Sequence, residues 1–246
     1  MYKYIAKYFL IERVYSFCNA VAFWSLGIGL VSFLTVSYIC LYVLPADAVQ
    51  SEVYRILFVH VPSAIFSELI YIFMAINGFI YLVWKTKISS IFLNAAINIG
   101  LVFTALVLIT GSLWGKPTWG TYWVWDARIT STFILLVQYV GLLALKTSFN
   151  TRSSADQIIS ILAIVGAINI PIIKFSVDWW NTLHQNASIT FSGSAIDGEM
   201  LYALPLMLAS FGFIAFFIFC RNIQREIIRS EEHTSELQSP CNLVCR

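Results

Sequence analysis

Six long hydrophobic runs, separated by short polar connections, dominate the sequence. The runs cover residues 21–44, 62–83, 91–113, 129–145, 158–177 and 201–220. Each is close to the ~20 residues that a helix needs to cross a bilayer. Backbone groups in lipid must be satisfied within their own segment, so these runs are predicted to be helices. We therefore expect an all-α, polytopic membrane protein with about six transmembrane helices.

Two of the runs fit this pattern less well than the others. The fourth is the shortest, and the fifth contains Pro171 and Lys174. Proline removes a backbone donor from a helix, and a lysine is costly in lipid. The prediction of six spans therefore depends most on these two segments.

The composition agrees with a membrane protein. Of the 246 residues, 59% are hydrophobic and 11% are charged, against about 25% charged in soluble domains. The net charge of +2 gives no general electrostatic attraction for nucleic acid, and the apolar runs make membrane lipid the expected surroundings. The sequence lacks a C-x-x-C-H motif, which excludes covalent attachment of a c-type haem to this chain.

Basic residues in the connections predict the orientation of the helices, because they are enriched on the cytoplasmic side. One side is expected to hold Lys3, Lys7, Arg13, Lys85, Lys87, Lys146, Arg152, Arg221 and Arg225. The opposite side is expected to hold Arg55, Lys116, Arg128 and Lys174. This difference predicts that both termini are cytoplasmic and that residues 114–130 lie outside.

Residues 1–228 are predicted to form a single six-helix domain. The segment 229–239, RSEEHTSELQS, looks like the translation of a sequencing-library adapter. We therefore expect 229–246 to be a non-native tail, which is excluded from fold reasoning. His233 lies in this tail and is not a candidate ligand.

The most unusual stretch is WGKPTWGTYWVWDARIT, residues 114–130, which holds four of the eight tryptophans. They are Trp114, Trp119, Trp123 and Trp125, followed by Asp126 and Arg128. Trp119 and Trp123 would share a face of a helix, whereas Trp123 and Trp125 would share a face of an extended strand. Pro117 and Gly120 argue against one unbroken helix, and both interpretations stay open. Asp126 and Arg128 could pair with each other or orient the entrance to the fourth span.

Outside the tail the sequence has two histidines, His60 and His184, and both are expected on the outer side. His60 ends the connection 45–61, whose apolar residues recur at helical spacing and predict a short interfacial helix. Two imidazoles facing across an aromatic surface would suit axial ligation of a haem iron. Arg55, Lys116 or Arg128 could then bind the haem propionates.

A different interpretation is an aromatic belt that anchors a non-haem permease or a structural membrane subunit. Glu68 lies within the second run, where an ionisable residue indicates either a functional site or a buried pair, for example with Lys174. The sequence has no G-x-x-x-x-G-K-[ST] motif, so energy from ATP through a P-loop would have to come from a partner.

The tryptophan stretch resembles a known signature. Trp114-Gly115, Trp119-Gly120 and Trp123-x-Trp125-Asp126-x-Arg128 are similar to the "WWD" motif of the haem-handling proteins of cytochrome c biogenesis. Residues 59–62 and 179–185 resemble the histidine segments of the CcmC family of these proteins. The likeness extends from the first span to residue 220. Ile129 stands where leucine is usual, a volume-conserving difference.

This resemblance implies a function. Family members hold haem b non-covalently and transiently at the outer face of the membrane and deliver it to the haem chaperone CcmE. They associate with CcmA and CcmB, an ABC-type complex, and with CcmD. By the matching motifs, His60 and His184 would be the axial ligands of the haem iron. The four tryptophans and Asp126 would form the haem and chaperone surface. The resemblance implies a transfer component, not an enzyme, in the bacterial inner membrane with its site facing the periplasm, or in an organellar equivalent.

Overall fold

The computed structural model describes residues 2–149, 151–180, 182–184, 189–190, 193–194 and 198–238. Its long helices are α1 (Tyr2–Tyr38), α2 (Leu57–Trp84), α3 (Lys87–Trp119), α4 (Ala127–Leu145), α5 (Arg152–Gly166), α6 (Asn169–Trp179) and α8 (Ala203–Gln238). Its short elements are the π-helical turn η1 (Ile39–Val43), the 3₁₀ turn η2 (Glu52–Ile56), α7 (Gly198–Leu201) and the strands β1 (Ile189–Thr190) and β2 (Gly193–Ser194). Six helical segments are long and apolar enough to cross a membrane, so the predicted all-α fold with six spans is confirmed.

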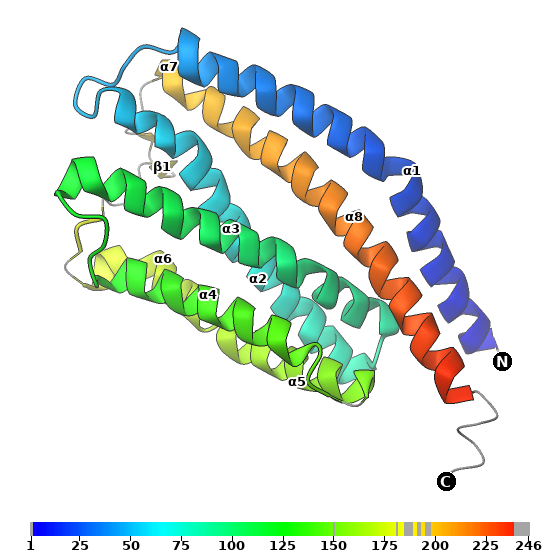
Figure 1. Cartoon of the computed structure of the whole chain (residues 1–246). Helices are drawn as coiled ribbons and strands as arrows, with labels where there is room; N and C mark the ends of the chain where they lie inside the picture. Colours follow the sequence, from blue (N-terminus) through cyan, green and yellow to red (C-terminus); the bar gives the residue numbers. More distant parts are fainter. Residues whose placement is uncertain are drawn as a thin grey trace.

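The helices form one elongated bundle (Figure 1). α1 and α8 lie side by side, α2 packs along α3, and α4 lies against α3 and α6. The beginning of α1 and the end of α8 lie at one end of the bundle, called here the terminal end. The opposite end carries the connections from η1 to α2, from α3 to α4 and from α6 to α8, and is called the site end. Residues 239–246 of the predicted tail lie outside the described residues.

Glycines allow the helices of the central core to approach one another. Tyr71 and Tyr139 are buried in a perpendicular contact with ring centroids 5.1 Å apart, and the Tyr139 hydroxyl donates to the Ser67 carbonyl at 2.8 Å. A Cβ at Gly100 would lie 2.2 Å from the Tyr139 ring, and one at Gly166 would lie 2.0 Å from the Tyr71 hydroxyl oxygen. Small residues at these positions therefore set the spacing of α2, α3, α4 and α5, as is common in membrane bundles.

The fifth span is made of two helices, α5 and α6, instead of one. α5 ends at Gly166, and α6 begins at Asn169 with Pro171 in its first turn, where a missing backbone N–H is tolerated. Side-chain amides bond backbone oxygens beside this interruption. Asn169 Nδ2 donates to the Ser131 carbonyl at 2.9 Å, and Gln138 Nε2 donates to the Gly166 carbonyl at 3.5 Å. The Gln138 bond gives a partner to a carbonyl at the interruption, as membrane depth requires, and the Asn169 bond joins α6 to α4.

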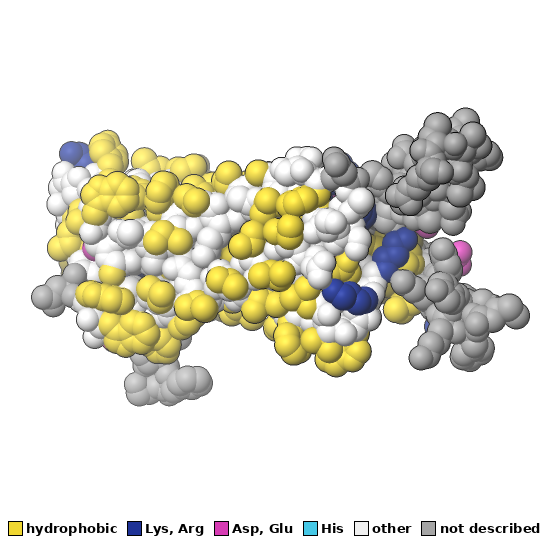
Figure 2. Space-filling model, turned by 90° about the horizontal axis from the view of Figure 1, so that it is seen from below, with side chains coloured by type: hydrophobic (Ala, Val, Ile, Leu, Met, Phe, Trp, Pro, Cys, Tyr) yellow, Lys and Arg dark blue, Asp and Glu magenta, His cyan; other side chains and the backbone are white. Residues whose placement is uncertain are grey.

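The outer surface suits a lipid environment. Large hydrophobic side chains are exposed on every one of the long helices. On the face seen in Figure 2 they extend along the length of the bundle, while Lys and Arg side chains lie near its ends. This distribution is typical of helices that cross a bilayer with their charged residues in the interfacial regions.

Buried charges connect α8 to the rest of the bundle at the terminal end. Glu226 on α8 lies 2.5 Å from Lys146 Nζ and 2.9 Å from Arg152 Nη2, and its side chain is only 8% exposed. Arg152 also lies 3.7 Å from Asp156, which accepts a hydrogen bond from Asn94 of α3 at 2.8 Å. This terminal-end charge network links α3, α4, α5 and α8.

Candidate functional site

His60 lies in the first turns of α2, at the site end of the bundle. η2 runs directly into α2, so the short helix predicted within 45–61 is present over residues 52–61, but it is continuous with the second span and is not a separate element. An isolated bridge between Asp47 and Ser51 closes the chain before η2. Pro62 consequently lies inside α2 and not at its first position.

One stretch of α3 fixes the ring of His60. Its Nδ1 lies 2.9 Å from the Thr110 hydroxyl oxygen. A Cβ at Gly111 would lie 3.1 Å from His60 Cε1, so a glycine there leaves room for the ring. The indole of Trp114 meets the imidazole edge-on, with ring centroids 5.7 Å apart, and is itself held by a hydrogen bond from Nε1 to Gln50 Oε1 at 2.8 Å.

His184 is held in a parallel way from the start of α4. Its Nδ1 lies 2.9 Å from Asp126 Oδ2, and Trp119 packs against its ring with centroids 4.8 Å apart. The Thr182 hydroxyl also donates to Asp126 Oδ2, while the other carboxylate oxygen accepts from the Ile129 N–H at 2.8 Å. Asp126 is therefore both the N-cap of α4 and the anchor of the second histidine.

The charges of this pair follow from their surroundings. Burial raises the pKa of Asp126, but the hydrogen bonds from Thr182, Ile129 and His184 outweigh it and lower the pKa overall. Burial lowers the pKa of His184 below its ordinary value of 6.5, against the opposing effect of Asp126. At neutral pH, Asp126 is therefore ionised and His184 is neutral, with Nδ1–H donating to the carboxylate. Within the described part of the chain, Nε2 of neither His60 nor His184 has a hydrogen-bond partner.

The tryptophan stretch is partly helical and partly extended. α3 continues through Pro117 to Trp119 and ends at Gly120, whose φ of 79° is the left-handed conformation that favours glycine. The helix thus carries Trp114 and Trp119, one beside each histidine. The first six residues of the predicted loop 114–130 are therefore helical, as a continuation of α3, and the non-helical part of the stretch begins at Gly120.

The remaining tryptophans of the stretch lie in the extended segment before α4. Trp123 and Trp125 pack with ring centroids 5.3 Å apart, and both contact Phe133 of α4. Their shared contact agrees with the extended alternative. Trp125 is 70% exposed, so it presents its ring at the surface.

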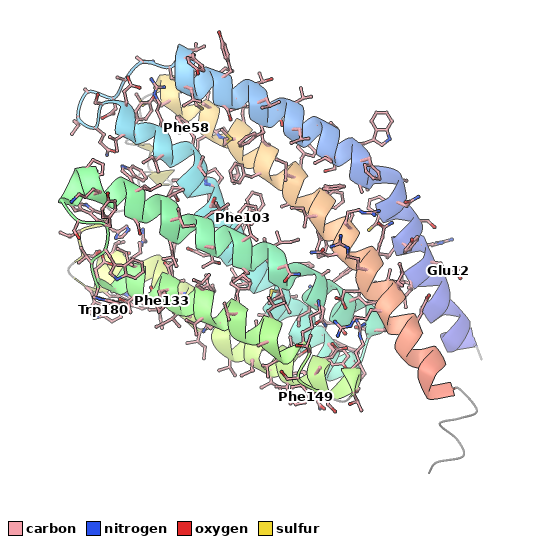
Figure 3. All side chains as sticks on the ribbon, in the orientation of Figure 1. Glu12, Phe58, Phe103, Phe133, Phe149 and Trp180 are labelled. Atoms are coloured by element: carbon pink, nitrogen blue, oxygen red, sulfur yellow. The ribbon has the colours of Figure 1, made fainter. Side chains whose placement is uncertain are left out.

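A second group of exposed aromatic rings comes from the end of α6. Trp179 and Trp180 are 57% and 51% exposed, and their ring centroids lie 5.8 Å apart. Figure 3 labels Trp180 and Phe133 at the site end. With Tyr122, which is also exposed, Trp125, Trp179 and Trp180 form a set that we call the exposed site-end aromatics.

Arg128 joins the start of α4 to the end of α6. Its guanidinium donates to the carbonyls of Ile173 and Lys174 and to the Ser176 hydroxyl at 3.2–3.4 Å. No hydrogen bond joins Asp126 to Arg128 in the described residues, so the orienting role, not mutual pairing, is the alternative that the geometry supports. The charge of Arg128 lies within electrostatic range of both histidines.

The guanidinium nitrogens of Arg55, a predicted propionate partner, already have hydrogen-bond partners. Nη1 donates to the Cys40 carbonyl, Nη2 donates to the Leu44 carbonyl at 3.1 Å, and Nε pairs with Glu52. A π-helical turn leaves carbonyl oxygens without their usual α-helical partners, and Arg55 supplies donors to that end of η1. The structure therefore places Arg55 as a brace between η1 and η2.

Glu68 lies two turns after His60 in α2, with its charge in electrostatic range of Lys174 and Arg128. Lys174 was one of its expected partners. Two asparagines of the neighbouring helices bond other groups: Asn94 donates to Asp156, and Asn169 donates to the Ser131 carbonyl.

Sequence reasoning missed Thr110, Gly111 and Thr182. Thr110 and Gly111 lie in an apolar run, and their one available signal is that Thr110 precedes Trp114 by a helical turn. No group of three or more His, Cys, Asp or Glu side chains that could hold a metal ion occurs in the described ranges. The site therefore offers two imidazole rings and aromatic surfaces.

The fold and this site define a six-span membrane protein with a two-histidine aromatic site at one end. The family model "CcmC: Heme exporter protein C" matches residues 4–238. "Heme exporter protein C" of Escherichia coli (strain K12) is 45% identical over 215 residues, covering 87% of this chain and 86% of that protein. The chain belongs to the heme exporter protein C (CcmC) family.

Two further relatives extend the comparison. "Putative cytochrome c biosynthesis ccmC-like mitochondrial protein" of Marchantia polymorpha is 46% identical, covering 85% of this chain and 91% of that protein. "Heme exporter protein C" of Bradyrhizobium diazoefficiens is 42% identical, covering 81% of this chain and 76% of that protein. The resemblance noted from the sequence is therefore confirmed, for bacterial and mitochondrial relatives alike.

Proposed function

We propose that this protein holds haem at the site end between His60 and His184 and delivers it to the haem chaperone CcmE in cytochrome c maturation. One observation carries the proposal: each imidazole has its Nδ1 engaged and a tryptophan against its ring, while its Nε2 is without a partner among the described residues. Histidine ligands to metals characteristically donate their other N–H to a carboxylate, carbonyl or water, which fixes the tautomer. The names of the relatives support haem as the cargo.

The ligand set fits carriage better than catalysis. Two histidines would leave the iron of the bound haem six-coordinate and low-spin, with no open position for oxygen chemistry. Haem b would be a non-covalent cargo, and we assign the component no enzymatic turnover. Energy, where the transfer needs it, would come from the ABC-type partners CcmA and CcmB, with CcmD as the accompanying subunit.

The neighbouring residues are assigned by their position. Trp114 and Trp119 would contact the haem beside its ligands, because each packs against one histidine. Arg128 is the proposed propionate partner, since its charge lies near both histidines, whereas the donors of Arg55 are committed to η1 and Glu52. Trp125 and Trp180 would face the chaperone, because their rings are exposed.

The first experiment measures the visible absorption of the protein purified with haem. His60→Ala and His184→Ala are each expected to abolish the low-spin spectrum, because each removes one axial ligand. His233→Ala is the matched control, a third histidine in the terminal segment, and should leave the spectrum unchanged. If both site variants keep the wild-type spectrum, the ligand assignment is wrong.

The exposed aromatic rings give a second prediction. Trp125→Ala and Trp180→Ala are expected to reduce haem loading of the chaperone more than they reduce the amount of protein in the membrane. Their rings are exposed, so little packing is lost. Loading of co-expressed chaperone and immunoblotting of the membrane fraction measure the two quantities. An equal loss of both would favour the anchoring belt of a non-haem membrane subunit.

The orientation gives a third prediction. We propose that the site end faces the periplasm of a bacterial inner membrane, or the equivalent organellar compartment, because the basic residues concentrate on the other side. A topology reporter fused at residue 88 should be active in the cytoplasm, and one inserted near residue 195 should be active outside. The reverse pattern would place the site on the cytoplasmic face and contradict the model of haem delivery.

A further inference from the structure

The two histidines differ in the group that accepts their Nδ1–H. His184 lies against a carboxylate, whereas His60 lies against neutral oxygens, the Thr110 hydroxyl at 2.9 Å and the Val107 backbone carbonyl. The partner of a ligand's second nitrogen sets the electron density on the nitrogen that binds the metal. A charged acceptor forms the stronger hydrogen bond, so it makes its imidazole the stronger donor.

The hydroxyl of Thr110 accepts from His60 because its single proton is already used. Thr110 Oγ1 donates to the Leu106 carbonyl at 2.6 Å, with the Val107 carbonyl at 3.3 Å as a second neighbour. A hydroxyl has one proton and two lone pairs, so a lone pair remains for the His60 Nδ1–H at 2.9 Å. This arrangement selects the tautomer of His60 that has its proton on Nδ1 and a free lone pair on Nε2.

Asp126 polarises the His184 ring more strongly than the Thr110 hydroxyl polarises the His60 ring, although the carboxylate accepts two other hydrogen bonds as well. Its carboxylate accepts from the Thr182 hydroxyl and the Ile129 N–H as well as from His184. These bonds fix the direction from which the carboxylate meets the imidazole. His184 therefore has an anionic partner in a set position, which His60 lacks.

We infer that His60 is the weaker, exchangeable ligand of the haem iron, and that Thr110 is the positioning residue that sets its bond; this inference rests on the proposed function. When haem is handed on, the bond to His60 Nε2 would be the one that breaks, as a ligand supplied by the acceptor takes its place. His184 holds the haem meanwhile. The oxidation state of the iron does not change, and the His60 proton stays on Nδ1.

The inference is tested by opening each ligand position in turn. Haem affinity of purified His60→Gly and His184→Gly is measured by optical titration, with and without added imidazole. We expect His60→Gly to bind haem about tenfold more tightly than His184→Gly, and imidazole to restore its low-spin spectrum. Equal affinities, or tighter binding by His184→Gly, would overturn the inference.

Thr110 is tested by Thr110→Val, which removes the hydroxyl and nearly keeps the shape. We expect the concentration of imidazole that displaces half of a haem ligand to fall by about tenfold. Thr110→Ser should restore the wild-type value. Thr104→Val is the matched control, because Thr104 is a buried threonine of α3 that bonds the Gly100 carbonyl and does not contact His60. Identical displacement in Thr110→Val and the wild type would remove Thr110 from the mechanism.

A measurement without haem separates this inference from the proposed function. The ¹⁵N chemical shifts of the His60 ring in the haem-free protein should indicate a proton on Nδ1 in the wild type and in Thr110→Ser, and a mixture of tautomers in Thr110→Val. A wild-type protein without a low-spin haem spectrum would contradict the proposed function. A low-spin wild type with the reverse order of ligand strength would contradict only the inference drawn here.

Discussion

Replacing Asp126 with asparagine is expected to weaken haem binding by about 10- to 100-fold, the range typical of lost partners of metal-ligating histidines. The carboxylate accepts from His184, Thr182 and the Ile129 N–H together. An amide has one acceptor oxygen and two donor hydrogens, so it cannot serve all three. Asparagine caps helices as well as aspartate does, and the start of α4 should therefore stay intact. Optical titration of the haem-free protein measures the affinity.

A comparison of two caps separates the effect on the site from an effect on folding. Asp126→Ala removes the cap of α4 as well as the partner of His184, at a cost of about 1 kcal/mol in stability. Thr151→Ala removes the corresponding cap of α5, where Thr151 accepts from the Ser154 N–H. Thr151→Ala should lose similar stability and bind haem normally. Wild-type affinity in Asp126→Asn would show that the carboxylate does not support His184.

Replacing Gly100 with alanine is expected to destabilise the protein by about 1–3 kcal/mol or more, because it overpacks a closed interface. The new Cβ would lie 2.2 Å from ring atoms of Tyr139, which is fully buried and tied by its hydroxyl to the Ser67 carbonyl. The ring cannot move away without breaking that bond. The midpoint of thermal unfolding in detergent should fall by about 2–10 °C.

Gly141 provides the matched control for this substitution. It lies on the exposed face of α4, and a Cβ there would meet nothing within 4 Å. Gly141→Ala should leave the midpoint unchanged or raise it slightly, since alanine favours helix more than glycine does. Equal midpoints for the two variants would show that α3 and α4 pack more loosely than the structure indicates.

The fold was largely predictable because the bilayer imposes one solution on a long apolar run. Length and hydropathy located all six spans, and the presence of Pro171 correctly marked the fifth as the weak one. What hydropathy could not show is that side-chain amides of Gln138 and Asn169 bond backbone oxygens beside the interruption. Those contacts depend on how α4 packs against α5 and α6, which is a tertiary property.

The site was predictable in its chemistry but not in its construction. Histidine and tryptophan are rare enough that their positions indicated a planar ligand. However, Pro117 and Gly120 both argued against one unbroken helix, and the helix continues through Pro117 and ends at Gly120. The role of Thr110 could not be predicted, because its partner His60 lies 50 residues away in the sequence. A threonine in an apolar helix can equally well bond only the backbone of its own helix. The assignment of His60 and His184 as ligands stays a prediction until it is measured.

The terminal-end charge network determines how far the chain can be shortened from its C-terminus. Glu226 pairs with both Lys146 and Arg152, and all three side chains are largely shielded from water. A truncation that removes Glu226 would leave Arg152 with Asp156 and Lys146 without a paired carboxylate, and breaking a buried pair in this way costs about 3–5 kcal/mol. A cut after residue 228 removes the whole adapter-like segment and keeps this counter-ion. Shortened forms intended for biophysical work should therefore end there and not at the membrane boundary near Cys220.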